Sequence, residues 1–140
     1  MMELLIEAGA VLAYSAVGVI LMALGFVLVD IVTPGNLRRQ IWLERNRNAA
    51  ILLASNLIAV GIIVAGAIVA SDGGLLRGLA LSFVYGVIGL VVMGISFVLL
   101  DIVTPGKLGE LLVQSEKHPA VWVSAAMHLA VALVILAGLS

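Results

Sequence analysis

The hexapeptide Asp-Ile-Val-Thr-Pro-Gly stands at residues 30–35 and again at residues 101–106. Each copy follows a long apolar segment without a charged residue, 8–29 in the first case and 78–100 in the second. A transmembrane helix needs about 20 apolar residues to cross ~30 Å of hydrocarbon, and both segments meet that length. The repeated hexapeptide therefore predicts the same membrane boundary twice in one chain.

The composition of the chain also indicates a membrane protein. Of its 140 residues, 64% are hydrophobic and only 11% are charged, and the mean hydropathy is +1.29. So little polar material cannot cover a globule in water. We predict an all-α, polytopic membrane protein with a single transmembrane domain over residues 1–140, whose four spans lie at about 8–32, 48–70, 78–103 and 119–139.

The two halves of the chain align at an offset of 71 residues. Between residues 17–37 and 88–108, 12 of 21 aligned positions are identical, and they include Gly, Met, Phe, Asp, Thr and Pro. Chance similarity between two apolar helices would favour Leu and Val instead. We therefore predict two tandem two-helix repeats, 8–70 and 78–139. Because each repeat holds two spans, both repeats enter the membrane in the same orientation.

Basic residues are distributed unequally between the two ends of the predicted spans. Six of the seven Lys and Arg residues lie on the side of the hexapeptides, and only Arg77 lies on the other side. Loops rich in Lys and Arg stay in the cytoplasm. The sequence thus places both hexapeptides in the cytoplasm and both termini outside it.

The second half of each hexapeptide predicts a helix stop and a tight turn. A residue before proline avoids the helical region, so each threonine should end its span. Pro-Gly then fits the two central positions of a turn. The residues of the two turns are Thr33, Pro34, Gly35, Thr104, Pro105 and Gly106.

The aspartate that opens each hexapeptide is placed against the helix dipole, which disfavours an acid at a C-terminal end. One interpretation of Asp30 and Asp101 is structural: each carboxylate pairs with an arginine or accepts backbone hydrogens from the turn. The other is that two carboxylates at equal depth bind a cation or exchange a proton on a permeation path.

His128 is an ionisable residue inside the fourth span. It lies nine residues after Pro119, which places it near the bilayer midplane, at almost the same depth as Asn56 in the second span. We expect a neutral histidine bonded to Ser124, a tyrosine or a carbonyl. The alternative is a proton relay or a contact with substrate.

Two tyrosines complete the set of candidates. Tyr14 and Tyr85 each begin a row of matched residues at every fourth position, which forms one ridge of a helix and should face protein. The candidate contacts with an ion or a proton are Asp30, Asp101, His128, Tyr14, Tyr85 and Asn56.

The segment after the first hexapeptide predicts a short interfacial helix, apolar on one side and basic on the other. Its arginines would attract anionic headgroups or dock a partner protein. The candidate residues for lipid or partner contact are Arg38, Arg39, Trp42, Arg45 and Arg47.

No enzyme motif is present in the sequence. It contains no HExxH, no Gly-x-Ser-x-Gly, no phosphate loop and no cysteine, and its two histidines cannot form a separate zinc site alone. We expect no catalytic residue, no metal and no cofactor. Nucleic-acid binding has no support in a mildly acidic chain whose basic residues follow topology.

The duplicated two-helix unit, with its two hexapeptides and the pairs Tyr14/Tyr85 and Gly18/Gly89, resembles the bacterial inner-membrane family catalogued as domain of unknown function 350. The resemblance covers the whole chain. It implies four spans built from two tandem copies and a location in the inner membrane. It implies no catalytic residue that can be carried over.

Two functions follow as hypotheses. The first is an oligomeric path, or a supporting subunit, for the movement of a proton, a cation or a small cationic solute. The second is a membrane scaffold or accessory subunit that transports nothing and recruits a cytoplasmic partner. The expected partners are the lipid bilayer, further copies of the same chain, and a cytoplasmic or membrane protein.

Overall fold

The computed structural model describes residues 1–32, 35–71, 73–103 and 119–139. Four long helices and one short helix lie in these ranges, and the four long ones are long and apolar enough to cross a membrane. The predicted all-α class with four spans is confirmed. The helices are α1 (Met2–Val32), α2 (Leu37–Trp42), α3 (Arg47–Ala70), α4 (Leu75–Val103) and α6 (Ala120–Leu139).

The helix ends follow local sequence signals. α1 begins at Met2 rather than near residue 8, because nothing before residue 8 breaks a helix and Glu3 in the first turn favours the dipole. α3 begins after Asn46, whose side chain accepts a hydrogen bond from the Ala49 N–H at 3.1 Å. Arg45, just before this cap, has a φ of 54° and turns the chain out of α2.

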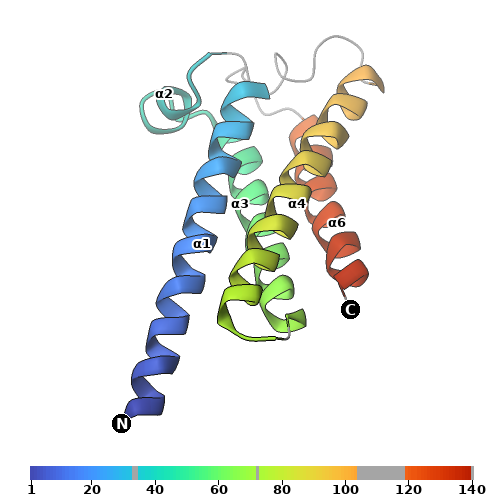
Figure 1. Ribbon diagram of the computed structural model, residues 1–140. Helices are drawn as coiled ribbons and strands as arrows, with labels where there is room; N and C mark the ends of the chain where they lie inside the picture. Colours follow the sequence, from blue (N-terminus) through green and yellow to red (C-terminus); the bar gives the residue numbers. More distant parts are fainter. Residues whose placement is uncertain (33–34, 72, 104–118, 140) are drawn as a thin grey trace.

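α3 is the central helix of the bundle and packs against α1, α4 and α6. Figure 1 shows both termini at one end of the bundle, and α2 at the opposite end, where α1 and α4 finish and α3 and α6 begin. α1 and α4 contact each other from the start of α4, where the Tyr14 hydroxyl packs on Gly78, to the later part of both helices, where Leu28 Cδ1 would lie 3.4 Å from a Cβ atom on Gly94.

The buried core forms two layers along the bundle. One layer, nearer α2, contains Val29, Leu52, Phe97 and Val121, and the other contains buried side chains such as Leu21, Val60, Ile63, Leu90 and Ala132. Large apolar side chains elsewhere are exposed, for example Leu12 at 72% and Val134 at 72%. In a bilayer these exposed side chains face lipid, so the helices contact the membrane over much of their surface.

The predicted repeats also have a counterpart in the helix contacts. A Cβ atom added to Gly18 of α1 would lie 3.8 Å from Val64 Cγ1 of α3. A Cβ atom added to Gly89 of α4 would lie 3.5 Å from Ile135 Cδ1 of α6. Both pairs are related by the offset of 71 residues. The duplication itself stays a prediction from the sequence.

Glycine allows α1 and α4 to approach each other. A Cβ atom on Gly86 would lie 2.8 Å from Leu21 Cδ2 and 3.1 Å from its Cγ. Leu21 has no exposed surface, so its side chain could make room for a Cβ atom only by displacing other buried groups. Small residues are the usual means by which membrane helices pack closely.

We expect Gly86→Ala to lower the free energy of unfolding by about 1–3 kcal/mol, as overpacking of a close-packed core does. Gly138→Ala is the matched control, since nothing lies within 4 Å of an added Cβ there, and its effect should stay below about 1 kcal/mol. Unfolding in detergent, followed by circular dichroism, measures both. Equal stability of the two variants would contradict the close contact of α1 with α4.

Candidate functional site

His128 lies on α6 with only 3% of its surface exposed. Its Nδ1 is 2.9 Å from the hydroxyl oxygen of Ser55 on α3, and that hydroxyl donates to the Leu52 carbonyl at 2.9 Å. A hydroxyl has one hydrogen, and a carbonyl can only accept. The imidazole must therefore donate from Nδ1 to Ser55, which leaves Nε2 as its basic nitrogen.

Asn56, the next residue on α3, is 1% exposed. Its Nδ2 donates to the Met93 sulfur of α4 at 3.9 Å, and sulfur is a weak acceptor. Its Oδ1 is fully buried and has no hydrogen-bond partner within the described ranges. Leaving a buried acceptor unpaired costs roughly 1–3 kcal/mol, so this carboxamide is the least satisfied polar group that we find in the bundle.

A small cavity of about 10 Å³ lies beside both side chains. This volume is close to the minimum that holds one water molecule. All four long helices contribute to its wall, and Asn56 and His128 are its polar members. The lining residues are Leu28, Val29 and Val32 from α1, Leu52 and Asn56 from α3, Met93, Gly94 and Phe97 from α4, and His128 from α6.

Gly25 brings the backbone of α1 against the same carboxamide. A Cβ atom at this position would lie 2.6 Å from Asn56 Oδ1 and 3.4 Å from Val60 Cγ2. Any larger residue would push α1 away from α3 or displace the Asn56 side chain. Gly25 is therefore a part of the site that the sequence analysis did not single out.

Ser55 was also missed by the sequence analysis, which expected His128 to bond to Ser124, a tyrosine or a carbonyl. That expectation was wrong. The Ser124 hydroxyl donates to the Ala120 carbonyl of its own helix at 3.2 Å, and the histidine bonds across to α3 instead. The position of Ser55 beside Asn56, at the depth of His128, was the signal that could have identified it.

Asp30 has a local hydrogen-bonding role in the structure. Its Oδ1 accepts a hydrogen bond from the Leu37 N–H at 2.9 Å, and Leu37 is the first residue of α2. Asn36 accepts from the Arg39 N–H at 3.1 Å in the same turn. The aspartate therefore lies against the dipole of α1 but at the start of α2, where an acid is favourable.

Asp101 is half-buried near the end of α4. Five of the six predicted turn residues lie outside the described residues, namely Thr33, Pro34, Thr104, Pro105 and Gly106. Gly35 is described and has a φ of +88°, a left-handed conformation that glycine adopts without strain.

The predicted ion contacts are divided between the two ends of the bundle. Asn56 and His128 share the cavity, and Asp30 and Asp101 lie at the same end, one helical turn after Phe26 and Phe97.

The two tyrosines lie away from the cavity. Tyr14 lies toward the other end of the bundle, where its hydroxyl packs directly on Gly78 of α4 and occupies the space that a Cβ atom there would need. Tyr85 is half-buried on α4. The buried apolar layer around Leu21 and Ile63 separates the tyrosines from the cavity.

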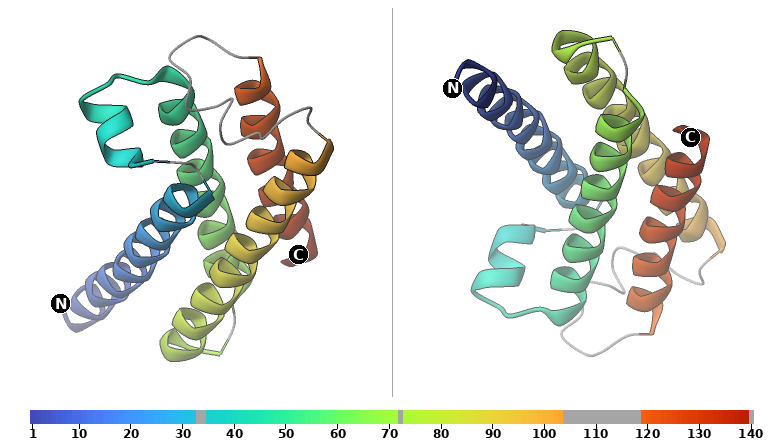
Figure 2. Two further views of the ribbon diagram at one scale, coloured as in Figure 1. Left: turned by 90° about the horizontal axis from the view of Figure 1, so that it is seen from above. Right: turned by 90° about the horizontal axis from the view of Figure 1, so that it is seen from below.

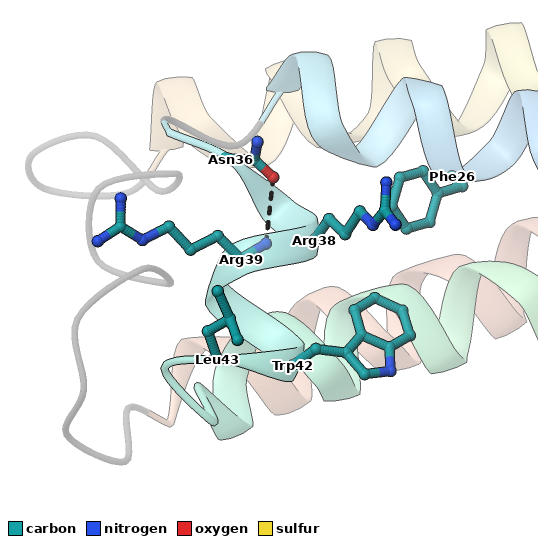
Figure 3. Close-up of a pocket in the computed structure, with 6 residues that line it drawn as sticks. All are labelled: Phe26, Asn36, Arg38, Arg39, Trp42 and Leu43. Carbon is teal, nitrogen blue, oxygen red and sulfur yellow. Dashed lines mark hydrogen bonds between the residues drawn. The ribbon is translucent and has the colours of Figure 1, made fainter.

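The predicted lipid or partner contacts gather around α2. Arg38, Arg39 and Trp42 line an open groove of about 690 Å³ together with Phe26, and Figure 3 shows these side chains. Arg47 lies elsewhere, with its guanidinium carbon 5.9 Å from the centre of the Trp122 ring.

No group of three or more His, Asp or Glu side chains that could hold a metal occurs in the described part of the chain.

We expect Asp30→Ala to expose the Leu37 amide to hydrogen exchange and to destabilise the protein by about 1–2 kcal/mol, because a charge-assisted bond to α2 is lost. Asp30→Asn keeps an acceptor oxygen and should retain most of the protection. Exchange measured by mass spectrometry on peptides that cover α2 tests both variants. Unchanged exchange in Asp30→Ala would show that the carboxylate does not hold this turn.

The chain is similar to proteins of known family. The sequence profile of the family described as Domain of Unknown Function (DUF350) matches residues 2–139. A UPF0719 transmembrane protein of Mycobacterium bovis is 40% identical over 131 residues, which cover 94% of this chain and 86% of that protein. A UPF0719 transmembrane protein of Mycobacterium tuberculosis matches with the same identity and coverage.

A third relative, a UPF0719 transmembrane protein of Mycolicibacterium paratuberculosis, is 32% identical over 94% of this chain and 87% of its own length. No solved structure matches the chain. The profile match covers nearly the whole chain, the relatives are transmembrane proteins, and the structure holds four helices that can span a membrane. The chain therefore belongs to the DUF350 family and is an integral membrane protein.

Proposed function

We propose that this protein supports the movement of a proton or a small cation across the membrane, and that the cavity between Asn56 and His128 is where the ion is held. The observation that carries the proposal is the buried, unpartnered Oδ1 of Asn56. An unpaired acceptor inside a membrane is costly, and intramembrane polar and ionisable residues usually mark ion pathways. A ligand in the cavity would remove this cost.

The two side chains of the site have complementary roles. His128 keeps its Nδ1 hydrogen on Ser55, so protonation and deprotonation would take place at Nε2. Because the cavity has a volume of only about 10 Å³, one water molecule or a small cation in it would lie next to both side chains. Asn56 would then hold the ion or the water by its carbonyl oxygen, while His128 accepts or releases a proton.

Access to the site would come from the hexapeptide end. Val29 and Val32 line the cavity, and Asp30 lies between them in sequence at the end of α1. Asp101 occupies the matching place on α4. Toward the opposite end, fully buried Leu21 and Ile63 close the bundle. Asn56 and His128 are only 1% and 3% exposed in this conformation, so we propose that a complete path needs a homo-oligomer or a second conformation.

We propose the bacterial inner membrane as the location, with both termini outside the cytoplasm. The support is the excess of basic residues at the hexapeptide end. A reporter that is active only outside the cytoplasm, fused after Ser140, should be active, and the same reporter inserted after Leu43 should be inactive. The reverse pattern would place the hexapeptide end outside the cytoplasm and contradict the proposed orientation.

The central experiment is ion flux into proteoliposomes that contain a pH-sensitive dye, with sodium or potassium gradients in parallel. We expect Asn56→Leu and His128→Phe to lower flux roughly tenfold, the equivalent of about 1.4 kcal/mol in the barrier. Ser124→Ala is the matched control: it changes a buried hydroxyl one turn from His128 that donates to the Ala120 carbonyl of its own helix. Its flux should stay within about twofold of the unmodified protein.

A stability measurement on the same variants separates function from folding. Asn56→Leu removes a poorly satisfied carboxamide, so the free energy of unfolding should stay equal or rise by about 1 kcal/mol. A variant that loses flux without losing stability supports an ion site. No flux above that of empty vesicles in the unmodified protein, together with a loss of stability in Asn56→Leu, would instead assign the cluster to packing.

A scaffold role is the second candidate. α2 stands outside the four-helix bundle (Figure 2) and exposes Arg38, Arg39 and Leu43, which is the form of a docking element. Recruitment of a cytoplasmic protein that depends on these arginines, with Asn56 and His128 dispensable, would favour this role.

A further inference from the structure

We infer that the groove between α1 and α2 is a binding site for an anionic phospholipid, with the lipid phosphate on Arg38. This inference does not depend on ion movement through the protein. The groove has a volume of about 690 Å³ and is lined by Phe26, Asn36, Arg38, Arg39, Trp42 and Leu43. It thus combines aromatic walls with guanidinium groups in one open hollow.

The orientation of α2 places this groove at the level of lipid headgroups. α2 appears end-on in Figure 1 and side-on in Figure 2, so it runs across the axes of the membrane-spanning helices and lies beside α1 and α3. It begins directly after the end of α1 and contacts α3 near its start. A short helix in this position lies along the membrane surface, and the groove beneath it opens toward lipid.

The side chains in the groove match the two parts of a phospholipid. Figure 3 shows Arg38, Trp42 and Phe26 pointing to the same side of α2. Trp42 is 62% exposed, and an indole prefers the boundary between headgroups and chains. Phe26 lies one turn before Asp30 on α1, so it lies deeper in the bilayer than Arg38, which follows the end of α1. A phosphate would meet Arg38, and the acyl chain would pass along Trp42 and Phe26.

The two arginines are not equivalent. Arg39 extends away from Arg38 in Figure 3, and its Nε lies 3.7 Å from the Glu44 carboxylate. Arg38 has no carboxylate partner in the part of the chain that the structure describes. A guanidinium pairs with phosphate through two parallel hydrogen bonds, and Arg38 has its full charge available for this. The preference for an anionic lipid therefore depends on Arg38 more than on Arg39.

The test is quenching of Trp42 by brominated lipids in detergent micelles. The chain has two tryptophans, so Trp122→Phe makes Trp42 the single reporter. We expect phosphatidylglycerol to bind at least about fivefold more tightly than phosphatidylcholine, as one well-placed arginine would give. Arg38→Gln should abolish this preference, Arg38→Lys should retain much of it, and Arg39→Gln should change it by less than about twofold.

Several outcomes would overturn the inference. Equal binding of the two lipids, or an undiminished preference in Arg38→Gln, would exclude an anionic-lipid site on Arg38. Displacement of the lipid by millimolar inorganic phosphate would assign the groove to a free phosphate. If circular dichroism shows that Arg38→Gln fails to fold, the same binding measurement on the protein with Arg38 intact is repeated at about 1 M salt, where the Debye length falls to ~3 Å. The preference for phosphatidylglycerol should then be lost. A preference that persists at this salt concentration would contradict the inference.

Discussion

The absence of hydrogen-bonding solvent in the hydrocarbon core is the constraint on which this structure depends. Every backbone amide in a span must be paired within the protein, which only a helix achieves in an open bundle. The same constraint applies to side chains. The hydroxyls of Ser55, Ser82 and Ser124 each donate to a carbonyl of their own helix. The Oδ1 of Asn56 departs from this pattern, and its burial beside a cavity is therefore informative.

The same reasoning explains the aspartate of the first hexapeptide. At the end of α1, the last carbonyls and an acid repel one another, and the sequence offers no local compensation. The compensation comes from the next helix, whose first amide points at the Asp30 carboxylate. The motif thus joins the end of a membrane span to the start of a surface helix. Asp30 therefore has a structural role, which is to hold the first amide of α2.

The sequence was sufficient to predict the spans and the short helix because both depend on local properties. Continuous apolar composition determines the spans, and the amphipathic segment after the Pro-Gly sequence determines α2. The start of α1 was the exception. Hydropathy indicates where the uncharged stretch of a span begins, and the helix itself can begin earlier, among charged residues. Buried Asn56 and His128 were also identifiable, because polar residues are conspicuous in apolar runs.

The partners within the site could not be predicted in the same way. Which residue faces His128 depends on how α6 rotates against α3, and the sequence alone does not give that rotation. A serine inside a span usually bonds to its own helix, so the position of Ser55 beside Asn56 was the one signal for its contact with His128. Gly25 was inconspicuous among many glycines. Its importance comes from the approach of α1 to Asn56, which is a property of packing.

The unequal lengths of the spans have a consequence for the surrounding bilayer. α1 has 31 residues and α6 has 20, which at 1.5 Å per residue corresponds to about 46 Å and about 30 Å. α6 matches a typical hydrocarbon thickness, whereas α1 exceeds it, so its first turns with Glu3 and Glu7 extend beyond the hydrocarbon unless the helix tilts. α1 also carries Gly25, which rests on the carboxamide of Asn56. A change of membrane thickness that alters the tilt of α1 would therefore also move the wall of the cavity that Leu28, Val29 and Val32 form.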